Sequence, residues 1–139
     1  DYTVAHAHLG VYGFFSMVMF GSAYYIVPRL TGREWASPLL IAVHFWSSAV
    51  GISVYVVGLT LGGWFQGGML NDPNVLFADV VKFIEPYRVT RSLGGSLMTV
   101  GHVSFAVLLG LNVFGWSNPR VDRRRFTDAP SHAAVPAVT

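Results

Sequence analysis

Three long stretches of the chain contain no Asp, Glu, Lys or Arg, and they cover residues 2–28, 35–71 and 92–119. Each is longer than the roughly 20 apolar residues that a helix needs to cross a bilayer core, whereas a strand of that length would be unusual. The pattern therefore predicts transmembrane helices at about residues 2–28, 39–65 and 92–117.

Polar and turn-forming residues separate the three predicted helices. Residues 28–35 combine Pro, Gly and an interfacial Trp, which is typical of a short turn at the membrane surface. Residues 67–91 form a longer connector, in which residues 75–85 are predicted to be a short amphipathic helix ended by Pro86. The tail over residues 120–139 is predicted to be disordered.

Composition agrees with a membrane protein and excludes other classes. The chain is 53% hydrophobic and only 12% charged, with a mean hydropathy of +0.49, which is outside the ordinary soluble range for charge. The net charge of +2 is too small to indicate nucleic-acid binding. Because Cys is absent, any metal or haem must use His, Met or oxygen ligands. We expect an all-α, polytopic membrane protein whose transmembrane region covers residues 1–119.

Basic residues predict the orientation of the three helices. With three spans, the first turn and the C-terminal tail share one side of the membrane. That side carries six basic residues and the other side three: Arg29, Arg33, Arg120, Arg123, Arg124 and Arg125 against Lys82, Arg88 and Arg91. The positive-inside rule then places the tail in the cytoplasm and the start of the first helix near the outer face.

The first predicted helix carries two histidines, His6 and His8. Residues i and i+2 of an α-helix are separated by about 200° of rotation, so the two imidazoles must point to different sides. One helix could then supply two separate haem sites, since imidazole is a common ligand of haem iron and Val4, Leu9 and Phe14 would suit porphyrin faces. The alternative is that both histidines only hydrogen-bond to neighbouring helices or line a water cavity.

Three further histidines and two arginines are candidates of a different kind. His44 and His102 lie inside the second and third predicted helices, where each stands alone and a hydrogen-bonded packing role is favoured. His132, in the tail, is expected to be inert. Arg88 and Arg91 lie at the outer end of the third helix; guanidinium groups can bind carboxylates such as haem propionates, but they also extend to lipid headgroups. Both interpretations stay open for Arg91, and the headgroup is favoured for Arg88.

The start of the chain indicates a segment of a longer polypeptide. There is no initiator Met, and the first apolar run begins at residue 2 with the His6 and His8 pair already inside it. We expect the remainder of the protein to hold the partners of these two histidines.

Five groups of residues together resemble the C-terminal end of the catalytic subunit of haem-copper oxidases, most closely the C-type, or cbb3-type, branch. The resemblance covers about residues 1–116 and implies the last three of the twelve core helices of that family. The five groups are Thr3-Val4-Ala5-His6-Ala7-His8, residues 25–34, His44-Phe45-Trp46, residues 63–67 and residues 91–95.

This resemblance implies roles for single residues. His6 would be the proximal ligand of a high-spin haem b that faces copper, and His8 would be one axial ligand of a low-spin haem b. Arg91, and with it Arg88, would pair with haem propionates. The family reduces oxygen to water with electrons from a c-type cytochrome and couples this reaction to proton translocation. Expected partners are the remainder of subunit I, other oxidase subunits, the cytochrome donor and the lipid bilayer of a bacterial-type inner membrane.

The resemblance also implies what this segment does not supply. The copper-binding histidines, the cross-linked tyrosine and the second low-spin haem ligand of the family lie on earlier helices. Copper is therefore not expected to be ligated by this segment, which alone should be inactive. His6-Ala7-His8-Leu9 is also similar to bacterial nitric oxide reductases, in which non-haem iron replaces copper, although residues 32–34 and 44–46 favour the oxidase.

Two interpretations from other classes remain. A non-catalytic di-haem electron carrier would require His44 or His102 to face His6 or His8. A structural or transport subunit would bind no cofactor at all.

Overall fold

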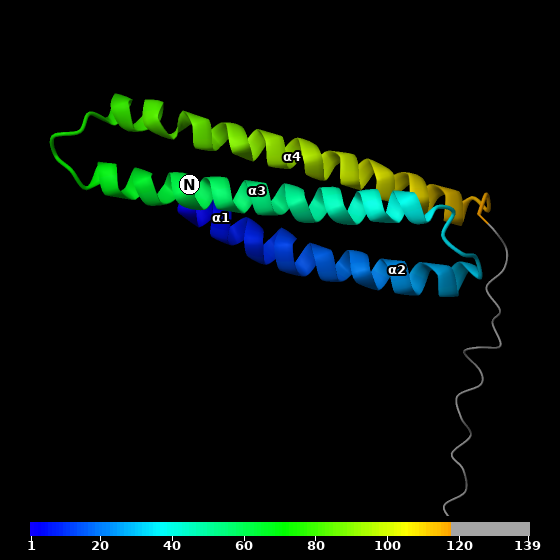
Figure 1. The fold of residues 1–139 in the computed structure, drawn as a ribbon. Helices are drawn as coiled ribbons and strands as arrows, with labels where there is room; N and C mark the ends of the chain where they lie inside the picture. Colours follow the sequence, from blue (N-terminus) through cyan, green and yellow to red (C-terminus); the bar gives the residue numbers. More distant parts are fainter. Residues whose placement is uncertain (118–139) are drawn as a thin grey trace, which may run out of the picture.

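The structure is a computed structural model that describes residues 1–117, so the predicted tail over residues 120–139 and His132 lie outside the described part. The described part is helical and contains no strand. Figure 1 shows two long helices side by side in opposite directions, with a further helical rod along the first of them. The elements are α1 (Tyr2–His8), the π-helix η1 (Leu9–Ser16), α2 (Met17–Thr31), α3 (Pro38–Leu70) and α4 (Phe77–Val113).

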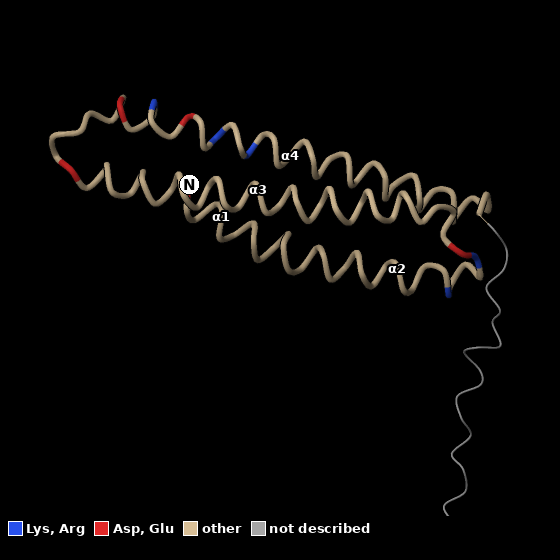
Figure 2. Tube along the Cα trace, viewed as in Figure 1, with Lys and Arg blue, Asp and Glu red and all other residues tan. Residues whose placement is uncertain are grey.

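Three helical stretches are long and apolar enough to cross a membrane, namely Tyr2–Thr31, Pro38–Leu70 and Phe77–Val113. At 1.5 Å per residue each exceeds a hydrocarbon core of about 30 Å, so their ends extend beyond it. Figure 2 shows the charged residues near the turn between α2 and α3, near the loop between α3 and α4 and along the N-terminal part of α4, with none over the rest of the three helical stretches. The prediction of an all-α membrane protein with three spans is confirmed.

The first rod continues three residues past its predicted end at Pro28. Proline has no N–H and cannot bond the carbonyl four residues earlier, which here belongs to Tyr24. The indole Nε1 of Trp35 donates to that carbonyl at 3.1 Å and so satisfies it. The rod ends instead at Gly32, whose positive φ of 68° is the left-handed conformation typical of a helix end.

The third helix differs most from its prediction. Instead of a connector over residues 67–91 and a span over 92–117, α4 runs without interruption from Phe77 to Val113 and contains Pro86. Val80 and Ile84 are 1% and 4% exposed, and their burial outweighs the hydrogen bond that Pro86 removes. The loop between α3 and α4 therefore covers only residues 71–76.

Small residues allow α3 and α4 to pack closely. A Cβ atom at Gly94 would lie 2.6 Å from the carbonyl oxygen of Gly51, and one at Gly101 would lie 2.6 Å from Oγ of Ser48. Helix pairs in membranes rely on such close approach, because lipid provides no hydrophobic force to bring them together. This contact makes α3 and α4 the frame on which the first rod rests.

The first rod rests on α3 through its N-terminal turn. Ala5 is fully buried and shares a core cluster with Ile52, Tyr55 and Leu59 of α3. Further toward the C-terminus of α3, Gly63 lies against the backbone of Tyr2. This docking fixes the rotation of α1 about its own axis and so determines where its side chains point.

Candidate functional site

His6 and His8 both lie on α1 and both are exposed. Because residues 2–8 form an α-helix, the two histidines are about 200° apart around its axis and project in different directions. Within residues 1–117, His6 makes no hydrogen bond and no ring contact. His8 is held more firmly, since its Nδ1 lies 2.8 Å from the carbonyl oxygen of Val4.

The bond to Val4 determines which nitrogen of His8 is available. A carbonyl oxygen only accepts, so Nδ1 of a neutral His8 must carry the proton and donate it to Val4. The lone pair of the imidazole then lies on Nε2, on the far side of the ring. A hydrogen bond from one ring nitrogen is the usual way in which a protein orients an imidazole for metal ligation through the other.

A π-helical stretch, η1, follows His8 directly. Such stretches widen the helix, and short ones are frequent at functional sites. From η1, the hydroxyl of Tyr12 reaches Nε2 of His102 on α4 at 3.1 Å. His102 thus has a polar partner, as the packing interpretation requires.

His44 is the most buried histidine of the described part, at 2% exposure. Its Nδ1 lies 2.6 Å from the hydroxyl of Tyr24 on α2. The rings of Phe20 and Phe105 lie 4.5 and 5.0 Å from its imidazole, and Nε2 has no hydrogen-bond partner within residues 1–117. Neither Tyr24 nor Tyr12 was among the predicted functional residues, because nothing in the local sequence pairs them with histidines 20 and 90 positions away.

Arg88 and Arg91 lie in the N-terminal part of α4, at the same end of the bundle as the histidine pair. Two neighbouring residues of α3 show that these parts lie at the same level: Gly62 contacts Tyr87 of α4, and Gly63 contacts Tyr2 of α1. Both arginines are exposed and line a hollow of about 300 Å³ together with Glu85, Val89 and Ser92. The structure does not bring either guanidinium into contact with His6 or His8.

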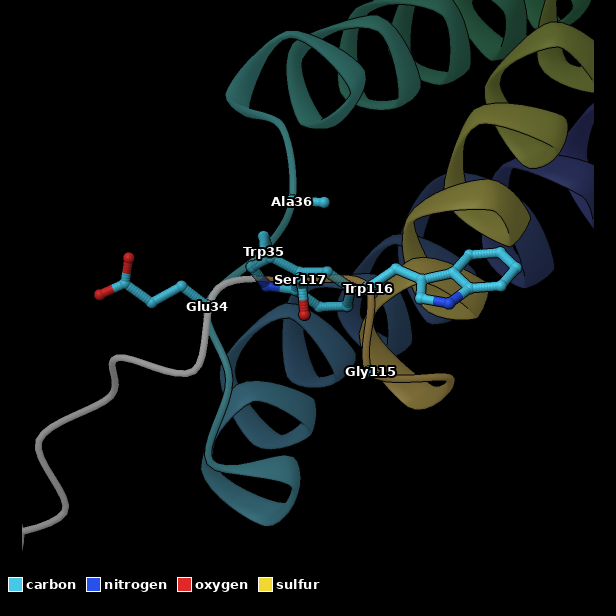
Figure 3. A pocket seen from close by; sticks show the side chains of 6 residues that line it. All are labelled: Glu34, Trp35, Ala36, Gly115, Trp116 and Ser117. Atoms are coloured by element: carbon cyan, nitrogen blue, oxygen red, sulfur yellow. The ribbon is translucent and has the colours of Figure 1, made fainter.

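A second hollow, of about 330 Å³, lies at the opposite end, between the loop after α2 and the end of α4 (Figure 3). Figure 3 shows Glu34 and Trp116 pointing away from each other, so their side chains do not converge on a common ligand. The nearby Arg33 donates to the carbonyl oxygens of Gly115 at 2.6 Å and Ser117 at 3.1 Å. These bonds attach the loop after α2 to the end of α4, and we call this attachment the joint.

The described residues contain no group of three or more His, Asp or Glu side chains that could hold a metal ion. The ligand candidates on α1 are His6 and His8, which point to different sides of the helix. The outer faces of the first rod are apolar there, because Leu9, Val11 and Phe14 are 49%, 67% and 70% exposed. The arrangement can offer one imidazole to each of two flat, apolar groups, and it needs other parts of a protein to complete either site.

A family model described as "Cytochrome C and Quinol oxidase polypeptide I" matches residues 1–97. The chain is 33% identical over 122 residues to a cytochrome c oxidase subunit 1 homolog of Agrobacterium tumefaciens, covering 83% of this chain and 23% of the relative. It is 34% identical over 113 residues to a cbb3-type cytochrome c oxidase subunit of Stutzerimonas stutzeri, covering 76% of this chain and 24% of the relative.

Cytochrome c oxidase subunit 1 of Rhodobacter capsulatus is 33% identical over 120 residues, which cover 81% of this chain and 23% of that protein. The chain thus spans about a quarter of the length of these relatives. No solved structure matches it significantly. The family match covers more than half of the 139 residues, and it includes the histidine pair and most of the two helices that support it. The chain therefore belongs to the cytochrome c and quinol oxidase polypeptide I family.

Proposed function

We propose that this chain is the part of a respiratory oxidase subunit that supplies one axial imidazole to each of two haems. His6 ligates the high-spin haem b and His8 the low-spin haem b. The observation that carries the proposal is the pair itself: two exposed imidazoles on one docked helix, with Nε2 of His8 freed by the bond between Nδ1 and Val4.

The described residues fit a haem in three respects. His8 has its ring anchored and its Nε2 unengaged, and His6 has no competing partner within residues 1–117. The exposed apolar side chains that follow the pair suit the face of a porphyrin as well as they suit lipid. When bound, the two haems supply electron transfer and oxygen binding; this chain contributes ligation, orientation and an apolar surround.

Arg91 and Arg88 are proposed to pair with the haem propionates. They lie at the same end of the bundle as the histidine pair, and the hollow beside them is lined also by Glu85, Val89 and Ser92. A guanidinium group binds a carboxylate through two parallel hydrogen bonds, which fix its position and balance its negative charge. In the whole subunit, this pairing would hold the haem edges toward the outer face.

The whole subunit is proposed to reduce oxygen to water with electrons from a c-type cytochrome and to couple this to proton translocation. The names of the relatives support oxygen as the substrate, rather than nitric oxide. Copper is proposed to bind elsewhere in the subunit, with other oxidase subunits assembled around it. The proposed setting is a bacterial inner membrane, with the tail in the cytoplasm.

The di-haem carrier is less well supported. In that alternative, His44 or His102 would have to face His6 or His8 across a haem. His44 instead bonds Tyr24, and His102 bonds Tyr12. The three described helices therefore form no pair of opposed, unengaged imidazoles.

The test uses the full-length subunit that contains this segment, purified with its haems in detergent. Optical and EPR spectra are recorded for the wild type, His6→Ala and His8→Ala, with His132→Ala as the control outside the matched residues 1–97. His6→Ala should remove the high-spin signal and His8→Ala the low-spin signal, while His132→Ala changes neither. The proposal fails if both haem signals survive both substitutions.

A further inference from the structure

Tyr55 of α3 is the aromatic neighbour of His8. Their ring centroids lie 4.9 Å apart and their planes are tilted by 37°. Tyr55 is only 5% exposed and belongs to the core cluster that receives Ala5. A ring packed in this way has little freedom to move, so it presents a fixed surface to the imidazole.

Gly94 of α4 stands behind Tyr55. A Cβ atom at Gly94 would lie 3.0 Å from both Cβ and the backbone nitrogen of Tyr55, and 2.6 Å from the carbonyl oxygen of Gly51. Two of these three atoms are backbone atoms, which cannot rotate away. A side chain at Gly94 would therefore push α3, and Tyr55 with it, away from α4. The next residue, Gly95, has nothing within 4 Å of such a Cβ.

The bond between His8 and Val4 leaves one degree of freedom undetermined. A single hydrogen bond at Nδ1 holds the ring by one atom, about which the imidazole plane can still tilt. The contact with Tyr55 lies on the ring itself and restricts that tilt. Two contacts of different kinds, one on the nitrogen and one on the ring, together define the plane.

We propose that Tyr55, backed by Gly94, is a positioning residue that fixes the ring plane of His8 and so tunes the low-spin haem. This inference rests on the proposed function, because it takes His8 as an axial ligand. The plane of an axial imidazole affects the EPR g-values of low-spin haem iron, and contacts around the ligand affect its reduction potential. Tyr55 would act on both without touching the iron.

The experiment uses the full-length subunit with its haems bound and measures low-spin g-values and the midpoint potential. Tyr55→Leu removes the aromatic surface, and Tyr55→Phe keeps it. Gly94→Ala displaces Tyr55 from behind, and Gly95→Ala is its matched control one position along α4. We expect shifted g-values and a changed potential in Tyr55→Leu and Gly94→Ala. Tyr55→Phe and Gly95→Ala should match the wild type.

His8→Ala separates failure of this inference from failure of the proposed function. If His8→Ala keeps the low-spin signal, the ligand role itself is wrong. If His8→Ala loses that signal while Tyr55→Leu and Gly94→Ala both match the wild type, only the positioning role is wrong. If Tyr55→Leu does not assemble, the comparison of Gly94→Ala with Gly95→Ala decides whether Tyr55 positions His8. If neither Tyr55→Leu nor Gly94→Ala assembles, the positioning role is also overturned, because the contact would then be needed for folding.

Discussion

The hydroxyl of Tyr24 lies 2.6 Å from Nδ1 of His44, and this bond joins the first helical rod to α3 in the apolar interior. His44 is 2% exposed and two phenylalanine rings pack around it. Water has little access to such a group, so loss of its partner would leave a buried polar atom unsatisfied. The bond is therefore expected to contribute to the stability of the helix assembly.

Tyr24→Phe tests this contribution, because it removes the hydroxyl and keeps the ring. Interhelical hydrogen bonds in membranes contribute about 0.5–2 kcal/mol, so the thermal unfolding midpoint of the purified full-length subunit should fall. Tyr25→Phe is the matched control: it lies next in the sequence and is 61% exposed. Equal midpoints for the two variants would show that the bond to His44 contributes nothing.

Gly51→Ala tests the close contact of α3 with α4. A Cβ atom at Gly51 would lie 2.9 Å from the carbonyl oxygen of Gly94 and 3.1 Å from the backbone nitrogen of Met98. Relief of this overlap requires the helices to separate, at a cost of about 1–3 kcal/mol. Gly67→Ala, on the same helix with nothing within 4 Å, should be neutral or slightly stabilising, because Ala is the better helix former. Denaturant titration of both variants measures the difference, and a Gly51→Ala protein as stable as wild type would contradict the contact.

The sequence was sufficient to predict the three spans and the divergence of His6 from His8. Charge-free runs determine the spans, and the angle between two residues of one helix is set by backbone geometry alone. Helix ends were less predictable. Pro86 predicts the end of a helix, but α4 continues through it, and Val80 and Ile84 of the preceding turns are buried.

The partners of the histidines could not be predicted for a related reason. Tyr12 meets His102 and Tyr24 meets His44 only because the helices have particular rotations about their axes. Those rotations follow from contacts such as Gly94 against Gly51, which join positions far apart in the sequence. Hydrophobic periodicity gives no guide to them, since these helices are apolar on most of their surface.

Asn112→Leu tests the joint between the loop after α2 and the end of α4. Asn112 is fully buried. Its Oδ1 accepts from Oγ1 of Thr31 at 2.7 Å, and its Nδ2 donates to the carbonyl oxygens of Arg33 at 3.4 Å and Glu34 at 3.3 Å. Leucine would leave the carbonyl oxygens of Arg33 and Glu34 without this donor, at a cost of about 1–3 kcal/mol, whereas Oγ1 of Thr31 can still donate to the carbonyl oxygen of Val27 at 2.9 Å.

The expected result is faster amide hydrogen exchange over residues 31–37 in the Asn112→Leu protein, because the loop loses its attachment to α4. Asn71→Leu serves as the control, since Asn71 is exposed at the end of α3. Exchange over residues 31–37 that is unchanged in Asn112→Leu would show that Arg33 alone, through Gly115 and Ser117, holds the joint.

Reporter fusions test the proposed orientation. The basic residues number six on the side of the first turn and the tail, against three on the side of the loop over residues 71–76. Because translocation of basic segments is disfavoured, a fluorescent protein fused after Thr139 should fold in the cytoplasm and fluoresce. Alkaline phosphatase, which is active only outside, should be active when inserted in the loop over residues 71–76 and inactive after Thr139. The opposite pattern would place His6 and His8 near the cytoplasmic face, where an electron donor outside the membrane could not reach a haem bound to His8 directly.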